Sequence, residues 1–258
     1  NNIPFSAKFG GATGNFNAHH VAFPEINWKE FGNDFVENNL GLKRQQTTTQ
    51  IEHYDNLAAL MDSIKRINNI FIDLSRDIWT YVSIDYFKQS IKKGEVGSSA
   101  MPHKVNPIDF ENAEGNLGMA NANFHYLVSK ITISKWQRDL TDSTSMRNIG
   151  SCFSYTLIAI SSLMKGLNKL KVNKKVIESD LNNSWEVLTE PIQTIMRKFA
   201  LKGGYDLMKD SSRGKKITKE QIHIFIKNLN IPIIEKTKLL KLTPSSYTGL
   251  SKKLADDI

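Results

Sequence analysis

The sequence has one cysteine, Cys152, among its 258 residues. A single cysteine forms no disulfide within the chain, which excludes the framework of a small disulfide-stabilised secreted protein. Cys152 lies in the apolar run SCFSYTLIAI. We therefore expect a buried thiol in a reducing compartment.

Long apolar runs are absent as well. No uninterrupted apolar stretch approaches the roughly 20 residues of a membrane-spanning helix. The first residues, NNIPFSAKFGG, do not combine a basic region with an apolar core as a secretion signal does. We expect a cytoplasmic protein with no membrane partner.

Metal-ligand spacing is missing among the histidines, so we expect no metal site. Basic residues are in excess, with 34 Lys and Arg against 26 Asp and Glu and a net charge of +8. Such an excess suggests nucleic acid first. However, the sequence has no zinc-finger spacing and no aromatic RNA-binding motif, and many lysines are scattered along predicted helices. We expect no nucleic-acid partner, and a small polyanionic substrate is equally compatible with the charge.

Glycine and proline are absent from residues 51–91, where apolar residues recur at steps of three and four. This pattern predicts one very long helix or two nearly collinear ones. Pro107, with Asn106 before it as a cap, opens a second predicted helix that runs to about Ser129. A third predicted helix ends near Lys171. Upstream, Asn27 and Glu30 suit a capping box of a short helix.

Breaks by glycine and proline become frequent after Val172, which predicts shorter helices. We find no β-alternation. The fold class predicted is all-α: a long central helical bundle in a partial domain over 1–174, followed by a small all-helical C-terminal domain over 175–258.

The segment GSSAMPHKVNP, residues 97–107, carries an unusual density of reactive groups. A serine hydroxyl ionises only with help from a cation or dipole, which Lys104 could supply. Asn106 could orient a carboxylate, and the helix after Pro107 presents amides that attract anions. A solvated surface loop is the alternative interpretation. The Gly-x-Ser-x-Gly elbow of hydrolases is absent, because Ser98 is followed by Ser-Ala-Met.

This segment resembles the signature loop of the fumarase/aspartase superfamily, Gly-Ser-Ser-x-Met-Pro-x-Lys-x-Asn-Pro. Further stretches are similar to adenylosuccinate lyases of the common bacterial type: TTTQIEHYD, IDFENAEGN, SKWQRDLTDSTSMRN, NNSWEVLTEPIQTIMR and LTPSSYTG. The resemblance thus spans essentially the whole chain. It implies an all-α homotetramer with active sites shared between subunits and no cofactor.

The activity that the resemblance implies is a β-elimination in purine nucleotide biosynthesis. Adenylosuccinate would be split into AMP and fumarate, and the succinyl adduct of aminoimidazole carboxamide ribotide would be cleaved likewise. Two other possibilities stay open. One is another fumarate-releasing lyase, such as argininosuccinate lyase or fumarase, and the other is a non-catalytic helical scaffold.

The resemblance assigns roles to residues of the signature segment. Ser98 matches the catalytic base, and Ser99 would hydrogen-bond the fumaryl carboxylate. Lys104 and Asn106 would hold carboxylates and stabilise the charged intermediate. His103 matches a loop position and is not the catalytic acid.

Other substrate-binding matches lie outside that segment. Gln50 and Asn112 match substrate-contacting positions, although Gln50 also suits a polar helix cap. Two arginines, hydroxyls and turn amides suit a phosphate or carboxylate cradle, formed by Arg138, Ser143, Thr144, Ser145, Met146 and Arg147. Ser145 and Met146 would bind through their backbone. The alternative for Arg138 is a surface salt bridge with Asp139 or Asp142.

The general-acid histidine motif of the superfamily is not found in these 258 residues. We therefore expect the chain to be the C-terminal part of a longer lyase and to be inactive by itself.

Overall fold

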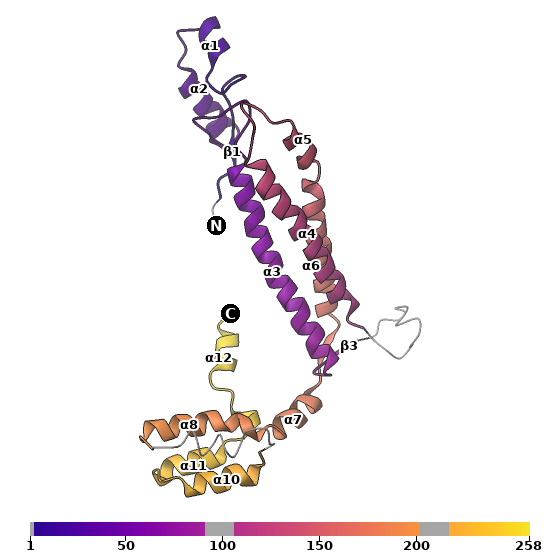
Figure 1. Cartoon of the computed structure of the whole chain (residues 1–258), viewed down its shortest axis with the longest axis vertical. Helices are drawn as coiled ribbons and strands as arrows, with labels where there is room; N and C mark the ends of the chain where they lie inside the picture. Colours follow the sequence, from indigo (N-terminus) through magenta and orange to yellow (C-terminus); the bar gives the residue numbers. More distant parts are fainter. Residues whose placement is uncertain (1–2, 91–105, 202–216) are drawn as a thin grey trace. The chain divides into compact units, whose positions relative to one another are not determined.

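The computed structural model describes residues 3–90, 106–201 and 217–258 (Figure 1). The chain divides into two compact units, residues 1–171 and 172–258, and each is described by itself. None of the helices among the described residues is both long enough and apolar enough to cross a membrane.

The first unit begins with a small subdomain that precedes the long helices. Its elements are β1 (Ser6–Ala7), α1 (Asn17–Ala22), α2 (Trp28–Asp34), η1 (Phe35–Asn39) and β2 (Lys43–Arg44). The strands β1 and β2 pair in parallel, with Ser6 opposite Lys43. Half of the predicted capping box is present, since the Glu30 N–H donates to the Asn27 side chain at 3.2 Å. The Glu30 carboxylate accepts from the Asn27 side-chain amide at 3.1 Å, whereas a capping box would use the Asn27 backbone N–H. Trp28, which opens α2, lies in an aromatic cluster with Phe16 and Phe31.

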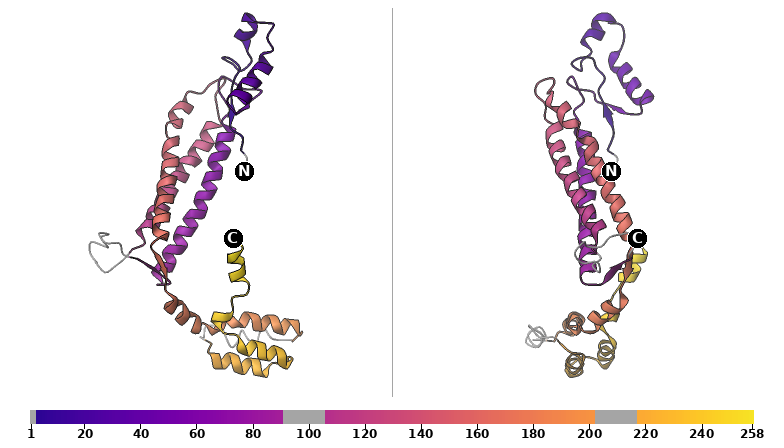
Figure 2. Two further views of the ribbon diagram at one scale, coloured as in Figure 1. Left: turned by 180° about the vertical axis from the view of Figure 1, so that it is seen from behind. Right: turned by 90° about the vertical axis from the view of Figure 1, so that its right-hand side faces the viewer.

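Three long helices form the predicted bundle (Figures 1 and 2). They are α3 (Asp55–Ser83), α4 (Ile108–Ile131) and α6 (Ile149–Leu167). Helix α4 packs against both of the others and is therefore the central one. Residues 51–91 thus contain one long helix rather than two, and this helix ends earlier than the absence of glycine and proline suggested.

Two clusters of buried residues hold the bundle together. One cluster is centred on Met61, Phe124 and Leu127, and it includes Cys152, whose side chain is fully buried. Burial raises the pKa of the Cys152 thiol, so the prediction of a buried thiol is confirmed. The other cluster lies nearer the start of α4 and contains Ile78, Phe110, Ala113, Leu117, Ala159 and Leu163.

A polar contact lies between these clusters. The buried Asn68 amide donates to the Asn121 side chain at 3.0 Å and to the Thr156 hydroxyl at 3.1 Å. These three residues come from α3, α4 and α6 respectively. Buried polar groups are strongly destabilising when they lose their partners, so this contact fixes the register of the three helices.

Two-residue and three-residue strands are the feature that the sequence did not predict. Strand β3 (Phe87–Gln89) follows α3 and pairs with β4 (Leu170–Val172), which follows α6. Strands this short carry too few residues for an alternating pattern to be recognised.

The second unit is built from short helices, as predicted. They are α7 (Lys174–Asn182), η2 (Trp185–Leu188), α8 (Thr189–Lys198), α10 (Lys219–Asn228), α11 (Ile233–Lys241), η3 (Pro244–Ser246) and α12 (Ser251–Asp256). Ile192, Met196, Ile222, Ile226 and Leu239 are prominent in its core. The Thr218 side chain and Gln221 form a capping box that begins α10.

Candidate active-site elements

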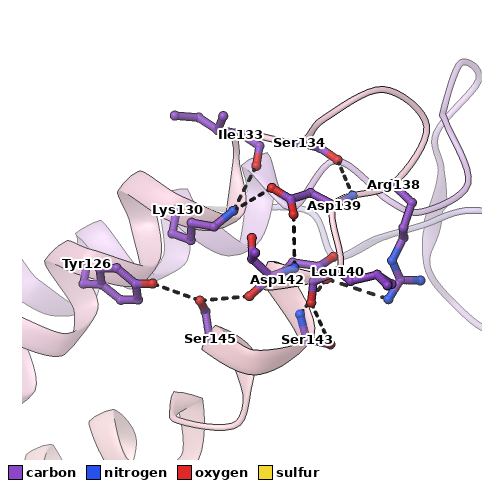
Figure 3. A network of polar contacts seen from close by, with 11 residues as sticks. Tyr126, Lys130, Ile133, Ser134, Arg138, Asp139, Leu140, Asp142, Ser143 and Ser145 are labelled. Atoms are coloured by element: carbon purple, nitrogen blue, oxygen red, sulfur yellow. Dashed lines mark hydrogen bonds and ion pairs between the residues drawn. The ribbon is translucent and has the colours of Figure 1, made fainter.

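The turn between α4 and the short helix α5 (Thr141–Met146) is organised around the Asp139 carboxylate (Figure 3). The backbone N–H of Thr141 donates to Asp139 Oδ1 at 3.1 Å, and Lys130 Nζ lies 3.3 Å from Oδ2. The backbone N–H of Asp139 itself donates to the Ser134 hydroxyl at 3.2 Å. Asp139 was expected only as a partner of Arg138, but the structure shows that it holds the turn in shape.

These contacts lower the pKa of Asp139 to about 2. The hydrogen bonds from Thr141 are the main cause, and Lys130 adds to them. A carboxylate with a lowered pKa stabilises the fold above its unfolded pKa near 4, and this contribution is lost as the pH falls toward 2.

We therefore expect Asp139→Asn to lower the stability of the protein at pH 6 and to lower it much less near pH 2. Urea unfolding at several pH values measures this, with Asp62→Asn, a half-exposed carboxylate of α3 paired only with Lys65 of the same helix among the described residues, as the control. A deficit of the Asp139 variant that is the same at pH 6 and pH 2 would contradict the assigned role.

Arg138 lies on the exposed side of this turn, where its guanidinium is 3.7 Å from Asp142 Oδ1. The salt bridge that was the alternative interpretation is therefore present. A partly exposed pair at this distance is weak, so it leaves anion binding by Arg138 possible. Asp142 is buried, and its Oδ2 atom has no hydrogen-bond partner among the described residues.

The remaining cradle residues divide into outward and inward groups. Ser143, Thr144 and Arg147 are exposed. The Ser145 hydroxyl is buried, donates to the Thr141 carbonyl at 3.1 Å and shares a 3.1 Å hydrogen bond with the Tyr126 hydroxyl. The Met146 side chain packs against the bundle core. The inward side chains are compatible with the backbone contacts expected of Ser145 and Met146, and these contacts stay a prediction.

Gln50 lies beside this turn although it is distant in sequence. Its backbone N–H donates to the Gln137 carbonyl at 3.2 Å, and its side chain is exposed. Tyr54 is a further neighbour that was not among the predicted site residues. Burial and then the Asp142 carboxylate raise the pKa of its phenol. The structure therefore brings Gln50, Tyr54 and Arg138 to one end of the bundle.

Two other predicted residues, Asn106 and Asn112, lie at the opposite end of α4. Asn106 precedes this helix, and Asn112 is in its second turn. The Asn112 amide donates to the Ser162 hydroxyl of α6 at 2.5 Å and receives a 3.0 Å hydrogen bond from Asn116. With its 24 residues, α4 is about 36 Å long, so one chain does not bring Asn112 and Arg138 into one site.

Ser98, Ser99 and Lys104 lie outside the described residues. The described residues on either side of them, Ser90 and Asn106, lie near the start of α4 and the β3–β4 pair. Among the described residues, no group of three or more His, Cys, Asp or Glu side chains is arranged to hold a metal ion.

Two family models match the chain. Residues 5–121 match a model described as lyase, and residues 134–248 match one described as adenylosuccinate lyase C-terminal.

Among curated proteins, the chain is similar to several named adenylosuccinate lyase. It is 49% identical over 256 residues to the one from Buchnera aphidicola (subsp. Schizaphis graminum), which covers 99% of this chain and 56% of that protein. It is 52% identical over 252 residues to that of Dictyostelium discoideum, and the match covers 96% of this chain and 54% of that protein. It is 46% identical over 258 residues to that of Escherichia coli K12, and the match covers 100% of this chain and 56% of that protein. The chain thus spans a little over half the length of these relatives.

A solved structure shares the fold. The crystal structure of a fumarate lyase:delta crystallin from Brucella melitensis bound to cobalt superposes with a TM-score of 0.60, over 85% of this chain and 48% of that one. The two sequences are 15% identical, so this likeness concerns the fold alone.

Proposed function

This chain belongs to the adenylosuccinate lyase family, and on that premise we propose that the protein carrying it splits adenylosuccinate into AMP and fumarate. The observation that carries the proposal is the identity of 46% to 52% to adenylosuccinate lyases along nearly the whole chain. The same site would cleave the succinyl adduct of aminoimidazole carboxamide ribotide. Both reactions belong to purine nucleotide biosynthesis and would take place in the cytoplasm.

The chemistry proposed is a β-elimination. Ser98 takes a proton from the carbon next to a carboxylate of the succinyl group, and the electron pair left behind spreads onto that carboxylate. Ser99, Lys104 and Asn106 hold the carboxylates and stabilise this charge. The C–N bond then breaks, and an acid from outside these 258 residues protonates the leaving amine.

The nucleotide end of the substrate is assigned to residues at the other end of the bundle. Arg138, Arg147 and the exposed hydroxyls of Ser143 and Thr144 suit a phosphate or carboxylate, and Gln50 lies beside them. Backbone amides of Ser145 and Met146 complete the proposed cradle.

We propose that the site is shared between subunits of a homotetramer. The length of α4 separates Asn112 from Arg138, whereas an antiparallel copy would place the start of one α4 beside the far end of another. Large apolar side chains on the long helices are exposed in the single chain, which supports such packing. They include Ile70, Met119, Tyr126, Leu157 and Met164.

The test uses the whole protein and a panel of substrates. We expect adenylosuccinate and the succinyl carboxamide ribotide to be cleaved, with AMP and fumarate formed in equal amounts from the former. Argininosuccinate and malate are the comparison substrates, because the fold is shared with a fumarate lyase of different sequence. Turnover of either one, with adenylosuccinate left intact, would overturn the proposal in favour of another fumarate-releasing lyase.

A further inference from the structure

One residue, Lys169, contacts the chain on both sides of the segment 91–105. The backbone N–H of Ser90 donates to the Lys169 carbonyl at 2.8 Å. Lys169 Nζ donates to Asp109 Oδ2 at 2.7 Å. Ser90 directly precedes the segment, and Asp109 stands in the first turn of α4 shortly after it.

The Lys169–Asp109 pair is buried, with 3% of the lysine and 4% of the aspartate exposed. Lysine is rarely buried this fully unless its charge is paired. Burial alone would raise the pKa of Asp109, but the hydrogen bonds from Lys169 and Lys165 outweigh it and lower that pKa. The half-exposed Lys165 side chain forms a second ion pair with Asp109, with its Nζ atom 3.1 Å from Asp109 Oδ1.

Close packing holds the same turn of α4 against α6. Gly166 of α6 has no side chain, and a Cβ atom there would lie 2.8 Å from the ring of Phe110. The fully buried Phe110 ring therefore fits against this glycine, next to Asp109. The position of the first turn of α4 is thus set by both shape and charge.

We propose that Lys169 and Asp109 are positioning residues for the elimination reaction. The Lys169 backbone carbonyl holds the Ser90 end of the segment carrying Ser98 and Lys104, and the side-chain pair holds the start of α4 after it. Neither residue touches the substrate. This inference rests on the proposed function, which assigns the base and the anion-stabilising lysine to that segment. Small displacements of reacting groups reduce turnover strongly, so losing the pair should lower kcat more than it changes KM.

The test compares variants of the whole protein. We expect Lys169→Met and Asp109→Asn each to lower kcat by about 10- to 100-fold, with a smaller change in KM. The double variant removes both charges of the ion pair, so neither member stays buried without the other. We expect it to regain melting temperature but not kcat.

Two controls separate positioning from general loss of stability. Leu163→Ala opens the core next to the same turn and should lower the melting temperature while leaving kcat within about twofold. Arg76→Met breaks an exposed 2.7 Å ion pair between α3 and α4 and should change neither quantity substantially. A double variant that recovers kcat together with melting temperature would overturn the inference, as would single variants with wild-type kcat.

A readout without activity keeps this inference separate from the proposed function. Trypsin cleavage after Lys104, shortly before the start of α4 that the side-chain pair holds, should be faster in Lys169→Met than in the wild type, relative to cleavage after Lys209 and Arg213. If the wild-type protein does not turn over adenylosuccinate, the proposed function fails, and the cleavage ratio still decides whether the pair positions the segment. An unchanged ratio would overturn the positioning role.

Discussion

Replacing Ser98 by alanine is expected to lower the turnover of adenylosuccinate by the whole protein about 10²- to 10⁴-fold, the usual contribution of a general base. The alanine removes only the hydroxyl that is proposed to take the proton. Substrate binding through Lys104, Asn106 and the arginines would remain, so KM should change far less than kcat. Steady-state kinetics with the wild-type and variant proteins measure both quantities.

The control for this change is Ser83→Ala, which removes an exposed hydroxyl that donates to the Thr80 carbonyl at the end of α3. It should leave kcat unchanged. The melting temperature and the oligomeric state of both variants must match the wild type. A Ser98→Ala protein that is folded, assembled and fully active would refute the catalytic serine and favour the non-catalytic scaffold.

The second large effect is expected from Lys104→Met. Methionine keeps much of the length of the lysine side chain but removes the charge that is proposed to stabilise the developing negative charge on the substrate carboxylate. Loss of one such preorganised donor typically lowers kcat about 10²- to 10³-fold. Because Lys104 also holds the ground-state carboxylate in the proposal, KM should rise as well.

Lys88→Met is the matched control, since Lys88 precedes the same segment and is exposed on β3, where it lies 3.8 Å from Asp85. It tests whether the loss of any positive charge in this region weakens turnover. Equal effects of the two changes would point to long-range attraction of the substrate instead of a direct contact by Lys104.

The helices of the bundle were predictable because their signals are local. The apolar repeat of residues 51–91 lies close to the observed α3. The predicted start of α4 is early by one residue, because Pro107 is itself the N-cap, and the predicted cap by the Asn106 side chain is wrong. The short helix α5 was not foreseen, since its six residues carry no apolar repeat. The β3–β4 pair joins residues that are distant in sequence, and no local sequence pattern predicts such a pairing.

For the candidate site, the residue types were predictable from the sequence, but their positions in space were not. The signature segment identified the residue types and their proposed roles by resemblance. Spacing could not reveal that Lys169 pairs with Asp109, because the two are 60 positions apart. Nor could it reveal that Asn112 and Arg138 lie at opposite ends of α4, because that follows from how far one straight helix extends.

The central claim is that the protein breaks a C–N bond after removing a proton from the carbon next to a carboxylate. The most direct measurement runs the reaction in reverse, from AMP and fumarate in D₂O, and determines the deuterium content of the adenylosuccinate formed. The account predicts one deuterium on the methylene carbon of the succinyl group, which lies beside a carboxylate and is not bonded to nitrogen. This deuterium is delivered by the residue that acts as base in the forward direction. Adenylosuccinate formed without deuterium at that carbon, or no adenylosuccinate at all, would contradict the account.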